Sequence, residues 1–424
     1  MATLDPPFLD DDHAHFSEDV TIQDIVNKRP QPSSIAAKRI FVLVSWTWYY
    51  LAMPMLWETL VLDSTNRALQ ILSGLSGLYW VIDGADAGPS PARFVEKILC
   101  IFDGSVQTGV DMTQLGIFVS DVVRRCPNLA LFASRGCTQA AVLRPIVDSL
   151  AHAASSRTLR KLDFGSSGQC LTMDPLQWNL VVELMGSTSV RTLVIPLDSS
   201  PEGDDAEPLD LRLPQPLEIY DASQLADVQT LVVTPRLFMC LRGEEVLPKL
   251  VDIHLFGVVV IEGKTELFES RIQEVPHLAD KVRSMRVREL PSYHPHHFIS
   301  CFRLLARFPL LVELCLELSE VYTYPKHLSE HNLHHPSITC MAIHLSRETA
   351  RMLAASRYGI SGSIRPEFRP MDHLARMLDV VTAIDLPNLS VIRLLGCSQE
   401  VILKAYRKEW TELLGSKGTA LRWV

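Results

Sequence analysis

One short segment of the sequence has the spacing of a metal-dependent hydrolase. His327, Glu330 and His331 fit the H-x-x-E-H pattern, in which two histidines bind Zn²⁺ and the glutamate activates a water molecule. Pro325 and Pro336 bracket the segment and leave room for only a short helix. Because ligands at this spacing need a continuous helix to hold them, we expect no metal site here. A zinc hydrolase that uses these three residues is the remote alternative.

The remaining sequence lacks the patterns of common catalytic sites. It contains no G-x-S-x-G, no phosphate-binding G-x-x-x-x-G-K-[ST] and no G-x-G-x-x-G. We therefore expect no catalytic residues and no cofactor. The nine cysteines form no C-x-x-C pair, and the first twenty residues are acidic where a signal peptide would be basic and apolar. Both features predict an intracellular protein, cytoplasmic or nuclear or both.

Charge is distributed unevenly along the chain. The formal net charge is −9, but residues 1–20 and 198–210 hold six carboxylates each and no lysine or arginine. The other residues therefore carry a slight positive excess, which is too small for the basic surface that nucleic-acid binding requires. We expect no nucleic-acid partner.

The densest apolar and aromatic stretch is Ile40–Leu62. It has no charged residue up to Trp57, which is just long enough for a membrane helix. Polar residues and Pro54 interrupt it, and its aromatic residues lie in the middle rather than at the ends, so we expect no membrane span. The pattern instead predicts two short helices that are separated at Pro54, because proline cannot donate a helical hydrogen bond. A strand is expected over Thr59–Leu62.

Several residues of this stretch follow a spacing that is known from one protein family. They are Leu43, Val44, Trp48, Leu51, Ala52, Pro54, Leu56 and Trp57. Their order resembles the second half of an F-box, in particular the F-box-like segments of fungal proteins with leucine-rich repeats. The first half of that motif, which begins Leu-Pro-x-Glu, is missing from this chain.

This resemblance implies a protein-binding role. The helices of an F-box bind a Skp1-type adaptor, which joins them to an SCF-type (cullin) ubiquitin ligase. The adaptor-binding residues that the resemblance implies are Ile40, Leu43, Val44, Trp48, Leu51, Pro54, Leu56 and Trp57. These partial F-box-like helices would occupy residues 33–58, after an acidic tail at 1–32 that we expect to be disordered.

A second pattern, apolar-x-x-apolar-x-apolar, recurs along the rest of the chain. The clear examples are Trp57/Leu60/Leu62, Leu159/Leu162/Phe164, Val190/Leu193/Ile195, Val228/Leu231/Val233, Leu250/Ile253/Leu255, Val282/Met285/Val287, Leu311/Leu314/Leu316, Ile338/Met341/Ile343 and Leu389/Ile392/Leu394. A weaker one lies at Leu129/Phe132. From there on, most are separated by roughly 22 to 38 residues, the length at which a strand and a helix stack as one repeat.

Amphipathic stretches that are typical of helices lie between these triplets. They include Pro91–Phe102, Asp111–Cys126, Leu143–Ala154 and Glu400–Leu414. Such alternation places parallel strands on one side and helices on the other. We expect an α/β fold, an irregular leucine-rich-repeat solenoid over residues 59–424 with a protruding acidic loop at 198–216. A general α/β fold is the alternative.

Charged residues between the buried positions of two triplets are candidates for partner binding. They are Arg283, Arg286, Arg288, Glu313 and Glu317. The arginines could bind an acidic or phosphorylated peptide. We expect instead that Arg286 and Arg288 pair with the two glutamates on the neighbouring strand, since exposed cross-strand pairs of opposite charge are common.

Together these patterns predict the substrate-recognition adaptor of a ubiquitin ligase. Its F-box-like helices would bind the Skp1-type adaptor, and its repeats would bind a protein substrate that the sequence does not identify. The alternative is a non-catalytic leucine-rich-repeat scaffold that has lost adaptor binding, in which the aromatic helices only cover the first repeat. The sequence gives no indication of the oligomeric state.

Overall fold

The computed structural model describes slightly less than half of the chain. The described residues are 46–76, 90–101, 109–135, 140–152, 157–164, 180–181, 183–185, 188, 190–194, 225, 227–233, 247–255, 279–287, 302–303, 305–318, 333–345, 384–395, 404–416 and 418–423. The acidic tail, the acidic loop at 198–216 and the His327–His331 motif lie outside them.

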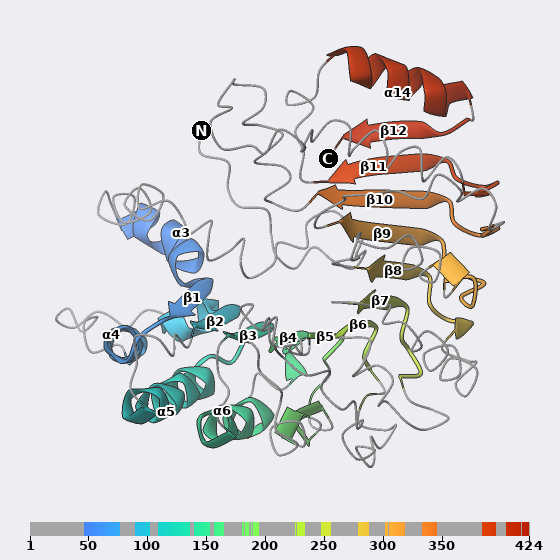
Figure 1. The fold of residues 1–424 in the computed structure, drawn as a ribbon. Helices are drawn as coiled ribbons and strands as arrows, with labels where there is room; N and C mark the ends of the chain where they lie inside the picture. The colour runs from blue at the N-terminus through green and yellow to red at the C-terminus, as the bar shows by residue number, and fades with distance from the viewer. Residues whose placement is uncertain are drawn as a thin grey trace, which may run out of the picture. The chain divides into compact units, whose positions relative to one another are not determined.

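The described residues contain twelve strands. Their bounds are β1 (Thr59–Leu62), β2 (Lys97–Ile101), β3 (Leu131–Arg135), β4 (Lys161–Asp163), β5 (Thr192–Val194), β6 (Thr230–Val233), β7 (Asp252–Leu255), β8 (Ser284–Val287), β9 (Glu313–Leu318), β10 (Cys340–Leu345), β11 (Val391–Leu395) and β12 (Ala420–Trp423). The chain divides into two compact units, one with β1–β5 and one with β6–β12. Within each unit the strands are parallel and follow one another in chain order (Figure 1).

One helix precedes the first strand of the first unit, and others connect its early strands. Their bounds are α3 (Trp46–Trp57), α4 (Thr65–Leu75), the 3-10 helix η1 (Pro91–Phe94), α5 (Gly109–Arg125) and α6 (Ala140–His152). Helices α4, α5 and α6 lie side by side along the sheet (Figure 1). In the second unit, α14 (Lys404–Ser416) lies next to β12. The chain is therefore an α/β protein with a parallel sheet, as the sequence predicts.

Apolar side chains of successive strands form a continuous buried row in each unit. In the first unit the row consists of Leu60, Ile98, Phe132, Leu162 and Leu193, which are aligned by the strand register. In the second unit it consists of Leu231, Ile253, Met285, Leu314, Met341 and Ile392. All of them are buried, and burying one such side chain contributes about 1.5–3 kcal/mol.

A repeated backbone hydrogen-bond pattern joins most of the described strands to the next one. We call the C=O group of the residue directly before a strand its pre-strand carbonyl. The pre-strand carbonyl of Glu58 accepts the N–H groups of Glu96 and Lys97, at 3.0 and 2.9 Å. The same pairing of two successive N–H groups with one carbonyl recurs at Glu96, Ala130, Arg160, Val251, Arg283, Val312 and Thr339.

Side chains three residues before a strand strengthen the same junctions. Asn128 Nδ2 donates to the carbonyl of Arg93 at 2.7 Å, and Asn388 Nδ2 donates to that of Pro336 at 2.6 Å. The hydroxyl of Ser337 makes the corresponding bond to the carbonyl of Leu311. These side chains satisfy backbone carbonyls that the turns between elements would otherwise leave to water.

Most predicted strands are confirmed, and one predicted helix is wrong. Every triplet of the sequence coincides with a strand, including the weak one that leads into β3. The stretch Pro91–Phe102 was expected to be helical, but it forms the short helix η1 and then strand β2. Ile98, Leu99 and Cys100 are all buried, so β2 lacks the alternation that marks a half-exposed strand.

Proline does not interrupt the helix before β1. The sequence predicts two short helices separated at Pro54, but α3 runs without a break from Trp46 to Trp57. Only one helical hydrogen bond is lost, because proline lacks an N–H group. The next turn is intact, since the Pro54 carbonyl accepts the N–H of Glu58 at 2.9 Å. Burial of Ala52 and Met53 holds the turn on the other side.

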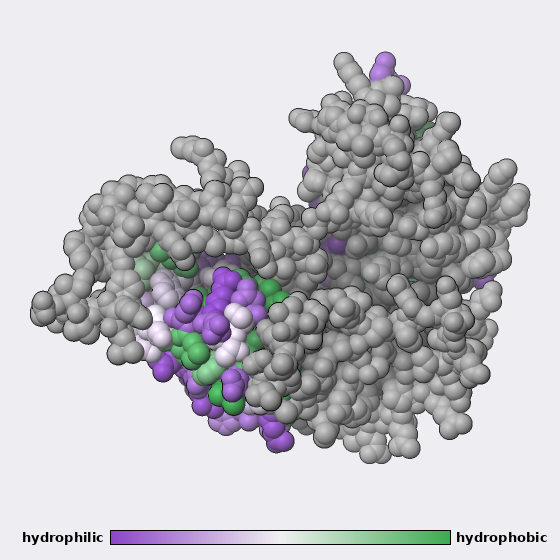
Figure 2. Space-filling view, turned by 60° about the vertical axis from the view of Figure 1, so that its left-hand side comes forward, coloured by the Kyte–Doolittle hydropathy of each residue, from purple (hydrophilic) through white to green (hydrophobic). Residues whose placement is uncertain are grey.

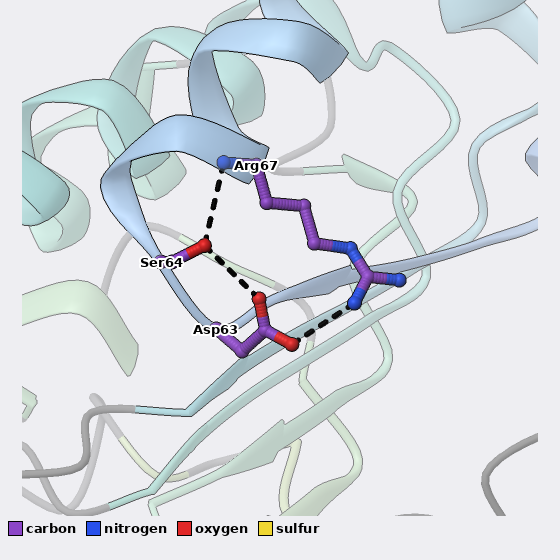
Figure 3. Close-up of polar contacts among 3 residues, drawn as sticks. All are labelled: Asp63, Ser64 and Arg67. Atoms are coloured by element: carbon purple, nitrogen blue, oxygen red, sulfur yellow. Dashed lines mark hydrogen bonds and ion pairs between the residues drawn. The ribbon is translucent and has the colours of Figure 1, made fainter. Parts of the chain in front are cut away.

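The start of α4 is fixed by a local polar cluster (Figure 3). Ser64 is the N-cap residue, and its Oγ accepts the N–H of Arg67 at 3.4 Å. The guanidinium of Arg67 donates to Asp63 Oδ2 at 2.9 Å, which places a carboxylate at the helix N-terminus. The direction in which the chain leaves β1 is therefore set by three neighbouring residues.

Helices α5 and α6 pack unusually closely at one glycine. A Cβ atom at Gly116 would lie 2.9 Å from both Cγ1 and the carbonyl oxygen of Val142. Such distances are shorter than real Cβ contacts, and backbone atoms cannot easily move away. Gly116 therefore allows the two helices to approach each other.

We predict that Gly116→Ala lowers the free energy of unfolding by about 1–3 kcal/mol, because the methyl group overpacks the helix contact. Gly415→Ala in α14 is the matched control, since a Cβ there meets nothing within 4 Å. Alanine is the better helix former, so the control should be neutral or up to about 1 kcal/mol more stable. Chemical denaturation measures both. Equal effects in the two variants would contradict the packing described for Gly116.

Candidate functional site

Helix α3 exposes apolar side chains on one face and buries the other. Leu51 and Met55, one turn apart, are 62% and 40% exposed, whereas Ala52 and Met53 are 7% and 4% exposed. Figure 2 brings the left-hand side of Figure 1 forward and shows hydrophobic surface lying among hydrophilic residues in the described part of the chain. Large apolar residues with this exposure cost free energy in water, so the pair is a candidate contact surface.

Another residue of the F-box-like pattern holds α3 onto the first repeat. A Cβ atom at Gly74 of α4 would lie 2.7 Å from Cη2 of Trp57, so the indole ring covers the glycine directly. Leu60, in the strand that follows, is fully part of the core. Trp57 therefore acts as a packing residue of the first unit.

The structure brings together only part of the predicted adaptor-binding set. Leu51, Pro54, Leu56 and Trp57 lie on α3, where Pro54, Leu56 and Trp57 are half-buried. Trp48 is in the same helix, but its side chain lies outside the description. Ile40, Leu43 and Val44 precede the described residues.

The second unit presents two polar rows on the face of the sheet opposite its buried row. The first row consists of Thr230, Asp252, Ser284, Glu313, Cys340, Val391 and Ala420, and the second of Val232, His254, Arg286, Cys315, Ala342, Arg393 and Arg422. We call these the first and second rows. Because side chains alternate along a strand, both rows share one face.

Exposure changes along the second row. His254, Arg286, Cys315 and Ala342 are at most 7% exposed, whereas Arg393 is half-buried and Arg422 is exposed. The second row is thus accessible at β11 and β12 and covered at β7–β10.

The register of β8 and β9 does not set Arg286 and Glu313 directly opposite each other but offsets them by two residues. Arg286 lies directly opposite Cys315, and Glu313 lies opposite Ser284. The buried triplets cause this shift, because aligning Met285 with Leu314 sets Arg286 beside the residue after Leu314.

The other candidate residues of this strip are dispersed. Arg283 is exposed and precedes β8. Glu317 belongs to β9, but its side chain is not described, and Arg288 lies outside the described residues. The arginine strip predicted from the sequence is therefore not a single described surface.

A carboxylate of the first row is held in an environment that favours its protonated form. Burial raises the pKa of Asp252, and the nearby His254 and hydroxyl hydrogen bonds lower it by less. The Thr230 hydroxyl donates to Asp252 Oδ2 at 3.2 Å. At neutral pH the folded protein therefore keeps a carboxylate where its charge is disfavoured.

Two arginines of the second row face each other at the end of the sheet. Arg393 on β11 is the direct register partner of Arg422 on β12. Burial raises the pKa of the Cys340 thiol, and both guanidinium groups act in the opposite direction, which places both within electrostatic range of the thiol. The sequence pattern missed this pair because no triplet marks β12, although Arg393 lies within a predicted triplet.

Neither a metal centre nor a membrane segment occurs in the described part of the chain. Among those residues, no group of three or more His, Cys, Asp or Glu side chains could hold a metal ion. No described helix combines the length and the apolar character needed to cross a bilayer.

We predict that Asp252→Asn stabilises the fold at pH 7 more than at pH 4. The pKa of Asp252 is higher in the folded state than in the unfolded state. The protonated carboxyl therefore contributes its full stability below the unfolded-state pKa, and this contribution is lost as the pH rises through the folded-state pKa. Asparagine cannot ionise, and its oxygen can still accept the bond from Thr230. Urea unfolding at both pH values tests this, with the exposed Asp280→Asn as control. Destabilisation at both pH values would contradict the burial effect.

Comparison with known proteins assigns no family to the chain. No protein-family model matches it, and no curated protein matches it. A crystal structure of a Bacteroides fragilis protein superimposes with a TM-score of 0.31 at 13% identity, over 68% of this chain and 73% of that protein. This TM-score is too low to assign a shared fold.

Proposed function

We propose that the chain is a non-catalytic substrate receptor of a cullin-type ubiquitin ligase. The segment around α3 binds a Skp1-type adaptor, and the parallel repeats, an irregular leucine-rich-repeat solenoid, bind a protein substrate. The observation that carries the proposal is the exposed pair Leu51 and Met55, because it lies within the run of residues that resembles an F-box. The receptor has no chemistry of its own.

Energetics support a contact at this pair. Burying a leucine or methionine side chain at an interface contributes about 1.5–3 kcal/mol, which is a large share of what a few anchor residues supply in a complex. The same helix packs on the rest of the first unit through its buried face, so its exposed face is already presented in the isolated protein. Little ordering free energy is then lost on binding.

The specific observation in favour of the scaffold alternative is the contact between Trp57 and Gly74. If α3 serves only to cover the first repeat, its amide protons are protected from exchange in the isolated protein and addition of the adaptor changes nothing. If α3 is a docking helix, protection increases when the adaptor is added. Hydrogen exchange of the purified chain, with and without adaptor, separates the two functions.

We predict that Leu51→Glu reduces retention of a purified Skp1-type adaptor by about tenfold or more, because a charge replaces the apolar contact. Leu413→Glu is the matched control: Leu413 is also an exposed leucine on a helix, α14, at 40%. Both variants should unfold at nearly the wild-type denaturant concentration, since both positions are exposed. Failure of the wild-type chain to retain adaptor, or equal retention by Leu51→Glu and wild type, would reject adaptor binding.

A further inference from the structure

The pair Arg393 and Arg422 is electrostatically unfavourable by itself. Strands in a sheet are about 4.8 Å apart, so residues in direct register hold their side chains close together. Like charges that are directly opposite each other destabilise a sheet. Within the part of the chain that the structure describes, neither guanidinium group forms an ion pair or a side-chain hydrogen bond.

The surroundings on β10–β12 do not neutralise this charge. Cys340 lies in the first row, and burial keeps its thiol protonated, so it supplies no negative charge. The residues of the first row on β11 and β12 are Val391 and Ala420, which are uncharged. The nearest carboxylate of the first row, Glu313, is two strands away from β11.

The position is also open to a ligand. Arg422 is exposed and Arg393 is half-buried, in contrast to the covered residues at β7–β10. Each guanidinium presents N–H groups in a planar fork that matches carboxylate or phosphate oxygens. Two forks at strand spacing can converge on one anion with several oxygens.

We propose that Arg393 and Arg422 form an anion-binding site for a phosphorylated side chain of the protein substrate. A phosphate monoester carries nearly two negative charges and three acceptor oxygens, so it compensates both arginines. A carboxylate carries one charge and leaves one arginine uncompensated. That the phosphate belongs to a protein substrate rests on the proposed function as a substrate receptor. Binding of the phosphate group itself does not depend on that function.

Calorimetric titration of the full chain with O-phosphoserine, at low ionic strength so that charge is weakly screened, tests the site directly. Wild type is expected to bind, and Arg393→Gln and Arg422→Gln should each weaken binding by about tenfold or more. Arg283→Gln is the matched control, because Arg283 is an exposed arginine outside both rows. Equal affinity in all four proteins, or no binding by wild type, overturns the proposal.

Stability of the ligand-free protein distinguishes binding from a structural role. Removing one of two opposed charges relieves repulsion, so both glutamine variants should unfold at the same or a higher urea concentration than wild type. Unfolding at a lower concentration means that the arginines are structural and overturns the proposal.

The source of the phosphate is tested with a mixture of random peptides that contain phosphoserine, compared with the same mixture containing serine. Preference for the phosphorylated mixture that is lost in Arg422→Gln supports the proposal.

A variant with Asp10→Asn, Asp11→Asn and Asp12→Asn tests whether the chain's own acidic segment occupies the site. Tighter phosphoserine binding by this variant would assign the site to that segment and overturn the proposal. Adaptor retention is measured separately, so loss of adaptor binding leaves these titrations interpretable.

Discussion

The pre-strand carbonyls are the constraint on which the structure depends. Eight of them accept two successive N–H groups at the start of the next strand, at distances near 3 Å. Their spacing fixes both the distance between repeats and the residue at which each strand starts pairing. Once the start is fixed, the register of the whole strand follows, and a shift of one residue would turn every buried side chain to the other face.

This register determines what the two faces of the sheet carry. On one face it aligns the apolar residues into a buried row, which supplies most of the stabilising free energy. On the other face it places charged residues of distant segments side by side, including Arg393 and Arg422, whose positions are separated by a whole helix. The hydrogen bonds that align the strands of the second unit therefore also determine which charged side chains lie next to each other.

The sequence predicts the strands well because the triplets reflect burial on one face. It fails where that signal is absent. Strand β2 is buried on both faces and reads as a continuous apolar run, which a helix could equally produce. Strand β12 has Gly418 where the first apolar residue of a triplet should stand, and this glycine adopts a φ of 75°.

Prediction of the candidate sites is less complete than that of the strands. Leu51 could be identified because the F-box resemblance names it, but its exposure depends on which face of α3 packs on the first repeat. The sequence indicates that Arg286 and Glu313 lie on neighbouring strands, but their offset by two residues depends on the register. The opposition of Arg393 and Arg422 could be found only once β12 was located.

The pre-strand carbonyls also explain how repeats of very different length coexist in one solenoid-like array. The side chains of Thr230 and Asp252, which are bonded across adjacent strands, are 22 residues apart in sequence. Ser390, whose hydroxyl donates to the backbone carbonyl of Thr339, is 51 residues from it. Both strand pairs are parallel although the connecting segment more than doubles. Loop closure becomes only slightly more costly with length, so insertions between strands are tolerated thermodynamically. Evolution could therefore vary the connections of this protein freely while the sheet, and the side chains that it aligns, stayed unchanged.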